Sequence, residues 1–317
     1  MSLTPDPSLP PPAPREYGVD PIHLHPLAYL LGLEGVALMR AFAGEYDAGY
    51  ARARIAEARA LLDRADELGD GVEVPPLTAA RGYDGWAPSY DSPDNPLFEM
   101  DEAVLLPWLR GLREGLAPGV AVDVACGTGR YAAHLAELGF EVSGYDASPG
   151  MLALAEAKVP GATFGLAPMD ALPLPDASAD VVVNTLALSH VRDLAPVFAE
   201  AARVLRPGGH LLVSDVRGYF VGSDRTPLPA RDPEGNVGYL PSWHHPTSAY
   251  LQAALASGLV ARRCEEPRYE VWEDEPATYD DPGTPPSIWA LHTWAPAAAV
   301  AVMSERRCLV VWDFERE

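Results

Sequence analysis

The sequence predicts an α/β protein built on a doubly wound parallel sheet. Three observations predict it: an apolar stretch that ends in a glycine turn at residues 119–130, acidic residues at the ends of consecutive predicted strands, and strand and helix patterns that alternate up to residue 216. Ligands of such sheets bind at the carboxyl ends of the strands. The acidic residues lie there, so we expect the functional site at that edge.

The glycine turn is the first element of this site. Gly119 to Ala125 has the apolar, β-branched composition of a strand covered on both faces. Gly127 and Gly129 then remove side chains where the backbone must bend and a ligand must come close. Residues 130–138 read as a helix that ends before Gly139. Free amides at the start of that helix would face a ligand on the turn, which indicates a nucleotide-type cofactor site.

Three aspartates indicate which kind of cofactor binds. Asp123 lies inside the first strand, Asp146 closes the second, and Asp170 follows a third predicted strand. The glycine pattern alone also satisfies the dinucleotide fingerprint. A pyrophosphate would gain little from three carboxylates, whereas a nucleoside that carries an amino acid and no phosphate suits them.

Several segments, in this order and spacing, resemble the class I S-adenosylmethionine (SAM) dependent methyltransferases, in detail their UbiE-like small-molecule branch. The segments are DVACGTG at 123–129, GYDASPGML at 144–152, MDALP at 169–173, DVVVNTLALSH at 180–190, RVLRPGG at 203–209 and LLVSD at 211–215. Ala125 stands where the family often has glycine, and we expect little harm from it. The resemblance covers roughly residues 95–217. It implies a Rossmann-like seven-stranded sheet whose last strand, 308–315, is an antiparallel edge strand, with SAM as cofactor and S-adenosylhomocysteine as product.

The resemblance and the chemistry of the side chains also suggest roles for the site residues. Asp146 should accept hydrogen bonds from both ribose hydroxyls, because two vicinal donors suit one carboxylate. Asp170 should accept from the adenine amine near the Ala171 amide, and Asp123, directly or through water, should meet the methionine ammonium. Met151 offers adenine a polarisable face, or it is plain core. The other expected cofactor contacts are Ala125, Cys126, Gly127, Thr128, Gly129, Ala147, Met169, Asn184 and Thr185.

Methyl transfer is a displacement at a sulfonium carbon, so the enzyme must align the acceptor and exclude water. An acceptor hydroxyl or ammonium also needs a base. The candidate catalytic residues are His190 after the fourth strand, His245 at the start of a later helix, and Tyr90. His190 also suits a structural role in the cofactor pocket, and the aromatic residues of the chain suit either core packing or an aromatic acceptor pocket.

The chain before the core divides into three stretches. Residues 1–20 are rich in proline and predict a flexible tail. Residues 21–80 predict two amphipathic helices separated near Gly44, which form a layer on the sheet domain, a substrate lid or a dimerisation arm. Residues 82–91 read as a loop, and the resemblance makes it a lid in which Tyr83 and Tyr90 face the sulfonium. We therefore expect a helical extension and cofactor lid over 21–94.

The remaining residues, 95–317, should form the SAM-binding domain. A substrate-facing insertion is expected at about 218–250. A helix is expected over 243–258, where it overlaps the end of this insertion, and a strand is expected after it over 259–264. The acidic residues 265–281 predict a solvated loop.

Composition excludes several classes of partner. The chain has 317 residues and a net charge of −22, so it should repel phosphate backbones, and nucleic acid is not expected as a substrate. The three cysteines show neither metal nor disulfide spacing, and no apolar run is long enough to cross a membrane. We expect a cytoplasmic protein with a small-molecule substrate, no metal and no membrane partner, and a homodimer formed through the N-terminal helices.

Two functions from different classes fit these observations. The first is a SAM-dependent methyltransferase that acts on O, N or C of a small, aromatic or lipophilic, secondary-metabolite-like molecule. The second is a protein of the same fold that binds SAM or S-adenosylhomocysteine without methylating, in a cyclase-like or binding role. Methylation of nucleic-acid amines is disfavoured because residues 184–187 lack the Pro-Pro-aromatic arrangement. A nicotinamide-dependent oxidoreductase ranks last.

Overall fold

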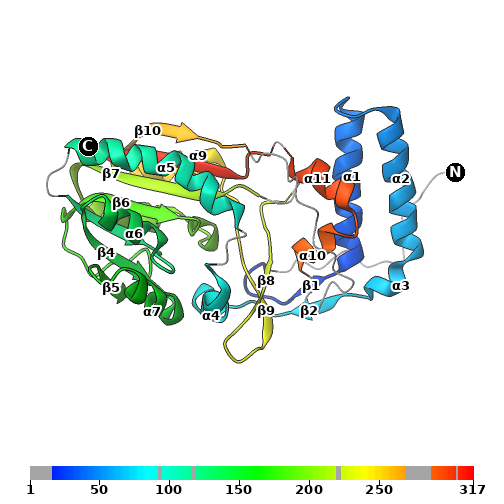
Figure 1. Cartoon of the computed structure of the whole chain (residues 1–317), viewed down its shortest axis with the longest axis horizontal. Helices are drawn as coiled ribbons and strands as arrows, with labels where there is room; N and C mark the ends of the chain where they lie inside the picture. The colour runs from blue at the N-terminus through cyan, green and yellow to red at the C-terminus, as the bar shows by residue number, and fades with distance from the viewer. Residues whose placement is uncertain (1–15, 92–94, 116–118, 219–222, 269–286, 305) are drawn as a thin grey trace.

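A seven-stranded sheet forms the centre of the computed structural model, which describes residues 16–91, 95–115, 119–218, 223–268, 287–304 and 306–317 (Figure 1). Its strands are β3 (Val120–Val124), β4 (Glu141–Asp146), β5 (Thr163–Leu166), β6 (Ala179–Thr185), β7 (Leu205–Val216), β10 (Leu259–Glu265) and β11 (Leu309–Arg316). They lie in the order β10-β11-β7-β6-β3-β4-β5. β11 pairs antiparallel with both neighbours and the other pairs are parallel, so the predicted sheet with an antiparallel last strand is confirmed.

The position of β11 differs from the prediction in one respect. We expected an edge strand, but β11 lies between β7 and β10, and β10 takes the edge. The reason is packing, because every residue from Leu309 to Phe314 is buried. A strand with both faces covered belongs inside the sheet, whereas β10 is exposed from Ala261 to Glu265.

Helices cover both faces of the sheet. They are α5 (Pro96–Gly115), α6 (Arg130–Glu137), α7 (Pro149–Lys158), α8 (Ala195–Val204) and α9 (Thr247–Ala256). Alternate residues of one strand enter different cores: Val122 packs with α8 and α9, and its neighbour Ala121 packs with α5 and α6. This double coverage explains the unbroken apolar runs in the sequence.

The N-terminal helices form a separate group beside the sheet. α1 (Pro26–Phe42) and α2 (Ala48–Asp63) are separated near Gly44 as predicted, and α3 (Ala65–Leu68) follows. Their apolar faces pack on α10 (Ile288–His292) and α11 (Pro296–Met303), in a core that includes Leu30, Leu61 and Ala298. Figure 1 shows this group away from the sheet. The apolar faces of these helices thus pack on residues 288–303, and the choice between a layer on the sheet domain, a substrate lid and a dimerisation arm stays a prediction.

A lid, residues 79–91, lies between the sheet and a small hairpin (Figure 1). It contains α4 (Ala79–Trp86) and a 3₁₀ turn, η1 (Ala87–Ser89), and the hairpin pairs β8 (Leu228–Arg231) with β9 (Val237–Leu240). The prediction of a loop over 82–91 is wrong for residues 82–86, which are helical. Its glycines serve packing: a Cβ on Gly82 would lie 2.4 Å from Cδ2 of Leu240, and one on Gly85 would lie 1.9 Å from the Arg231 carbonyl oxygen.

The chain that leads into the lid also contacts the hairpin. β1 (Ile22–Leu24) pairs with β2 (Val72–Val74), and the Tyr239 amide of the hairpin donates to the Pro75 carbonyl at 3.0 Å. Residues 16–20 form a turn in which the Tyr17 ring packs 5.6 Å from that of Trp243. The rest of the predicted tail, 1–15, and residues 269–281 of the predicted acidic loop lie outside the described residues. Among the helices of the described ranges, none has the length and apolar character needed to cross a membrane.

Candidate functional site

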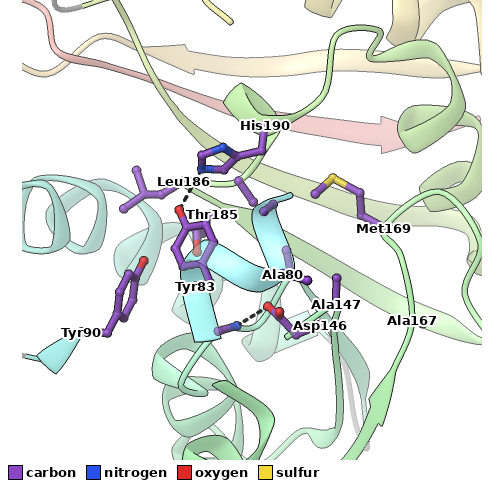
Figure 2. A pocket seen from close by; sticks show the side chains of 14 residues that line it. Ala80, Tyr83, Tyr90, Asp146, Ala147, Ala167, Met169, Thr185, Leu186 and His190 are labelled. Atoms are coloured by element: carbon purple, nitrogen blue, oxygen red, sulfur yellow. Dashed lines mark hydrogen bonds between the residues drawn. The ribbon is translucent and has the colours of Figure 1, made fainter. Parts of the chain in front are cut away.

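A cavity lies beneath the lid, where the carboxyl ends of β4, β5 and β6 meet the glycine turn (Figure 2). The space within it, including a part that is open to solvent, is about 580 Å³. The predicted site residues that line it are Tyr83, Tyr90, Ala125, Gly127, Asp146, Ala147, Met169, Thr185 and His190. The structure therefore brings the lid tyrosines, the turn and the strand ends together.

Five further residues, which the sequence did not indicate as site residues, also line the cavity: Ala79, Ala80, Ala167, Leu186 and Ala187. A signal for each exists in the sequence. Ala79 and Ala80 precede Tyr83 by four and three positions, which is one helical turn, so a helix in the lid would have placed them on the same face. Ala167 follows β5, and Leu186 and Ala187 follow β6.

The two glycines of the turn have different functions. Gly127 has a φ of +52°, and in the described part of the chain an added Cβ would meet nothing within 4 Å, so a ligand can approach its backbone. Gly129 has a φ of +79°, and its added Cβ would lie 3.0 Å from the Cβ of Ala155 in α7. Gly129 therefore permits close packing between the turn and α7. Ala125 adopts a φ of +56°, which L-residues rarely do.

The Asp146 carboxylate ends β4 inside the cavity (Figure 2). Oδ2 accepts a hydrogen bond from the Gly127 amide and Oδ1 accepts one from the Ser148 amide, both at 2.8 Å. Burial raises the pKa of Asp146 above its ordinary value, and these amides oppose that shift. A carboxylate has about four lone-pair sites, so both oxygens can still accept from a ligand.

Tyr83 and His190 form a hydrogen-bonded pair across the cavity (Figure 2). His190 Nδ1 lies 3.1 Å from the Pro241 carbonyl oxygen, which can only accept, so we assign the proton to Nδ1. His190 Nε2 then accepts from the Tyr83 hydroxyl at 2.8 Å. Burial lowers the pKa of His190, which keeps the ring neutral at pH 7. The pair is chemically able to take a proton from a ligand.

The other two candidate catalytic residues are placed differently. Tyr90 lines the cavity, but burial raises its pKa to about 12, so its phenol stays protonated at neutral pH and acts as an aromatic wall. His245 does not line the cavity. Its Nε2 lies 3.2 Å from the Leu188 carbonyl oxygen and 3.0 Å from that of Val191, so it donates to the backbone there. We therefore do not retain His245 or Tyr90 as a base.

Several predicted cofactor residues support the turn from behind. Asp123 is 1% exposed and accepts from the Ala132 amide of α6 at 2.8 Å, and burial raises its pKa to about 7. The side-chain amide of Asn184 donates to the Val124 carbonyl at 3.1 Å. Cys126 is buried, and burial raises the pKa of its thiol, which makes it unreactive. Met151 is 1% exposed and belongs to the core.

The remaining predicted contacts lie at the margin of the site. Asp170 and Ala171 are exposed, next in sequence to Met169, which lines the cavity. The Thr128 hydroxyl donates to Asp91 at 2.6 Å instead of facing the cavity. Among the described residues, no group of three His, Cys, Asp or Glu side chains is arranged to hold a metal ion.

Parts of this chain are similar to known proteins. Residues 122–213 match the model of a family described as a methyltransferase domain. A malonyl-[acyl-carrier protein] O-methyltransferase from Hahella chejuensis is 41% identical over 107 residues, which cover 32% of this chain and 38% of that protein. A demethylmenaquinone methyltransferase from Renibacterium salmoninarum is 34% identical over 154 residues, 48% of this chain and 64% of that protein. The chain thus spans less than two thirds of the length of both relatives.

A solved structure is also similar. The S-adenosylmethionine dependent methyltransferase from Mesorhizobium loti has 26% sequence identity and a TM-score of 0.47, and the match covers 66% of this chain and 96% of that chain.

Proposed function

We propose, from the premise that residues 122–213 form a class I SAM-dependent methyltransferase domain, that the protein transfers the methyl group of SAM to an O, N or C atom of a small molecule. One observation carries this proposal. A single cavity combines the Asp146 carboxylate, the open space in front of Gly127 and the rings of Tyr83 and Tyr90. These groups match the ribose, the amino-acid end and the sulfonium of one cofactor.

The arrangement supports a specific placement of SAM. Asp146 would accept from the ribose hydroxyls, and Ala147 and Met169 would lie along the adenosine, with Asp170 and Ala171 as the predicted partners of the adenine edge. Tyr83 and Tyr90 would face the sulfonium, whose positive charge is attracted by aromatic rings. Ala125, Gly127 and Thr185 would line the methionine end. When bound, SAM supplies an electrophilic methyl group.

The other end of the cavity supports an apolar acceptor. Leu186, Ala187 and Ala80 line it near His190. Among the described residues that line the cavity there is no lysine or arginine that would hold an anionic acceptor, which favours a neutral aromatic or lipophilic molecule. His190 Nε2 would take the proton of an acceptor hydroxyl or amine that replaces the Tyr83 hydroxyl. The relatives are named for malonyl-[acyl-carrier protein] and demethylmenaquinone, and the proposal assigns neither molecule to this chain.

Two further points belong to the proposal. The first is a cytoplasmic location, which the scattered cysteines favour. The second is a homodimer through the N-terminal helices. Its support is the exposure of Phe42 (96%) and Met39 on α1, and sedimentation velocity of wild type against Phe42→Ser tests it.

The direct test of the proposed function is transfer of an isotope-labelled methyl group from SAM to a panel of neutral phenols and amines and their carboxylic-acid counterparts. We expect labelled product from neutral members of the panel. Binding of S-adenosylhomocysteine without transfer to any member would contradict the proposal and support the non-methylating function.

A further inference from the structure

Each lid tyrosine is followed in sequence by an aspartate that binds the sheet domain. Tyr83 and Tyr90 line the cavity, whereas Asp84 and Asp91 do not. Asp84 Oδ1 accepts from the Ser148 hydroxyl at 2.5 Å and from the Gly150 amide at 2.8 Å. These donors lie at the start of α7, where the helix dipole also favours a carboxylate. Asp84 therefore fastens the lid to the first turn of α7.

Asp91 fastens the lid at the other end of the same helix. Its Oδ2 forms an ion pair of 2.6 Å with Lys158, the last residue of α7, and its Oδ1 accepts from the Thr128 hydroxyl at 2.6 Å. Lys158 also donates to Thr128 at 3.1 Å. Because Thr128 belongs to the glycine turn, Asp91 joins the lid to the turn as well as to α7.

The two attachments differ in strength. The Asp91 and Lys158 side chains are 46% and 34% exposed, so salt screens their attraction and the pair is weak. Asp84 is partly buried and makes two charge-assisted hydrogen bonds, which are stronger. Lys158 is also the single lysine among 23 lysine and arginine residues, so its chemistry can be followed alone.

We propose that Asp84, Asp91 and Lys158 are positioning residues that hold Tyr83 and Tyr90 over the cofactor and thereby set the rate at which SAM dissociates. The inference rests on the proposed function, because it takes SAM as the ligand beneath the lid. The tyrosines must move before a ligand beneath them can leave. Each tyrosine directly precedes an aspartate that is attached to the sheet domain, so loosening either attachment raises the population of open lid.

The experiment measures the dissociation of labelled SAM after a chase of unlabelled SAM. Asp84→Asn keeps the size of the side chain and should dissociate about tenfold faster, as expected for hydrogen bonds to a charged group. Asp91→Asn and Lys158→Gln should dissociate about threefold faster, and Lys158→Arg should restore the wild-type rate. A matched control is Asp176→Asn, which removes another exposed ion pair, with Arg203, and should leave the rate unchanged.

Salt provides a readout that a merely structural role would not change. In 1 M NaCl the wild-type dissociation rate should approach that of Asp91→Asn, and the rate of that variant should change less between low and high salt. Acylation of Lys158, followed by peptide mass, should slow when SAM is bound to the wild type but not to Asp91→Asn. Melting temperatures identify any variant that fails to fold.

The outcomes separate the two proposals. Wild-type SAM binding, with dissociation rates equal in all variants, overturns the role of the three residues and leaves the proposed function standing. A wild type that binds no SAM overturns both.

Discussion

Ala125 holds a backbone conformation that its side chain disfavours. Its φ of +56° places the Cβ close to the following carbonyl, where glycine has no such contact. From the sequence we expect alanine to do little harm here, whereas its left-handed backbone has a physical cost. Because the residue lines the cofactor cavity, the strain lies at the site itself.

Ala125→Gly should therefore raise the free energy of unfolding by about 0.5–1 kcal/mol, because relief of the left-handed strain exceeds the extra entropy of an unfolded glycine. Urea denaturation measures it. Ala133→Gly, inside α6, is the control and should lower stability by about 1 kcal/mol. Equal losses in both variants would contradict the strain at Ala125.

His190 is the residue on which the proposed chemistry depends. His190→Gln should lower kcat by about 10²–10⁴-fold, a typical contribution of a general base, with little change in SAM affinity. The neutral ring is the active form, and burial lowers the pKa of His190. Activity should therefore persist below the ordinary histidine value of about 6.5 and fall only as pH drops through the lowered pKa.

A rate–pH profile for wild type, His190→Gln and the surface control His134→Gln checks this. The acid limb should disappear only in His190→Gln. If that variant keeps both the limb and the wild-type kcat, His190 is not the base.

At the scale of elements, local patterns predicted the strands and helices around the site, because each βα unit has its own glycine, proline or cap signal. The lid was misread as a loop for a physical reason. An exposed glycine destabilises a helix, but Gly82 and Gly85 face the hairpin. Their lack of a side chain lets the helix pack closely there. His245 lies against backbone carbonyl groups, and the sequence has no signal for such partners.

Gly85→Ala tests the contact between the lid and the hairpin. The added Cβ would overlap the Arg231 carbonyl oxygen, 1.9 Å away, so the hairpin must shift and stability should fall by about 1–3 kcal/mol. Gly111→Ala in α5 is the matched helical control. In the described structure its Cβ meets no atom within 4 Å, so stability should rise by about 0.5–1 kcal/mol. Thermal unfolding compares them, and a stabilised Gly85→Ala would contradict the close contact.

At the scale of the molecule, the assembly of distant segments could not be predicted from the sequence. The Tyr29 hydroxyl of α1 lies 2.7 Å from His292 of α10, across 263 positions of the chain. The periodicity of each segment indicates an apolar face, but it does not indicate which other segment covers that face. The sheet was predictable because the motifs that identify it lie in consecutive strand–helix units of the chain.

Two buried aspartates should stabilise the molecule more in mild acid than at pH 8. Burial raises the pKa of Asp123 to about 7 and that of Asp215 to about 6, whereas an unfolded aspartate has about 3.9. The folded state then binds protons more readily at these two groups, so their contribution to stability rises as pH falls from 8 to 5.5, by about 2 kcal/mol for Asp123. The lowered pKa values of His190, His244 and His292 act in the opposite direction. The reduction of the −22 net charge acts in the same direction.

Urea denaturation at pH 8 and pH 5.5 measures this gain. Asp123→Asn keeps an acceptor for the Ala132 amide but cannot titrate, so it should show a smaller gain than the wild type. The same change of stability with pH in the wild type and in Asp123→Asn would contradict the prediction.

The central claim is that the cavity at the end of β4 binds SAM, and calorimetric titration with SAM, S-adenosylhomocysteine and NADPH tests it most directly. We expect the wild type to bind the first two and not NADPH. Asp146→Ala should weaken SAM binding by about 100-fold or more, because two hydrogen bonds to a charged group are lost, while Asp176→Ala should bind normally. Failure of the wild type to bind SAM or S-adenosylhomocysteine, or unchanged SAM affinity in Asp146→Ala, would contradict the account.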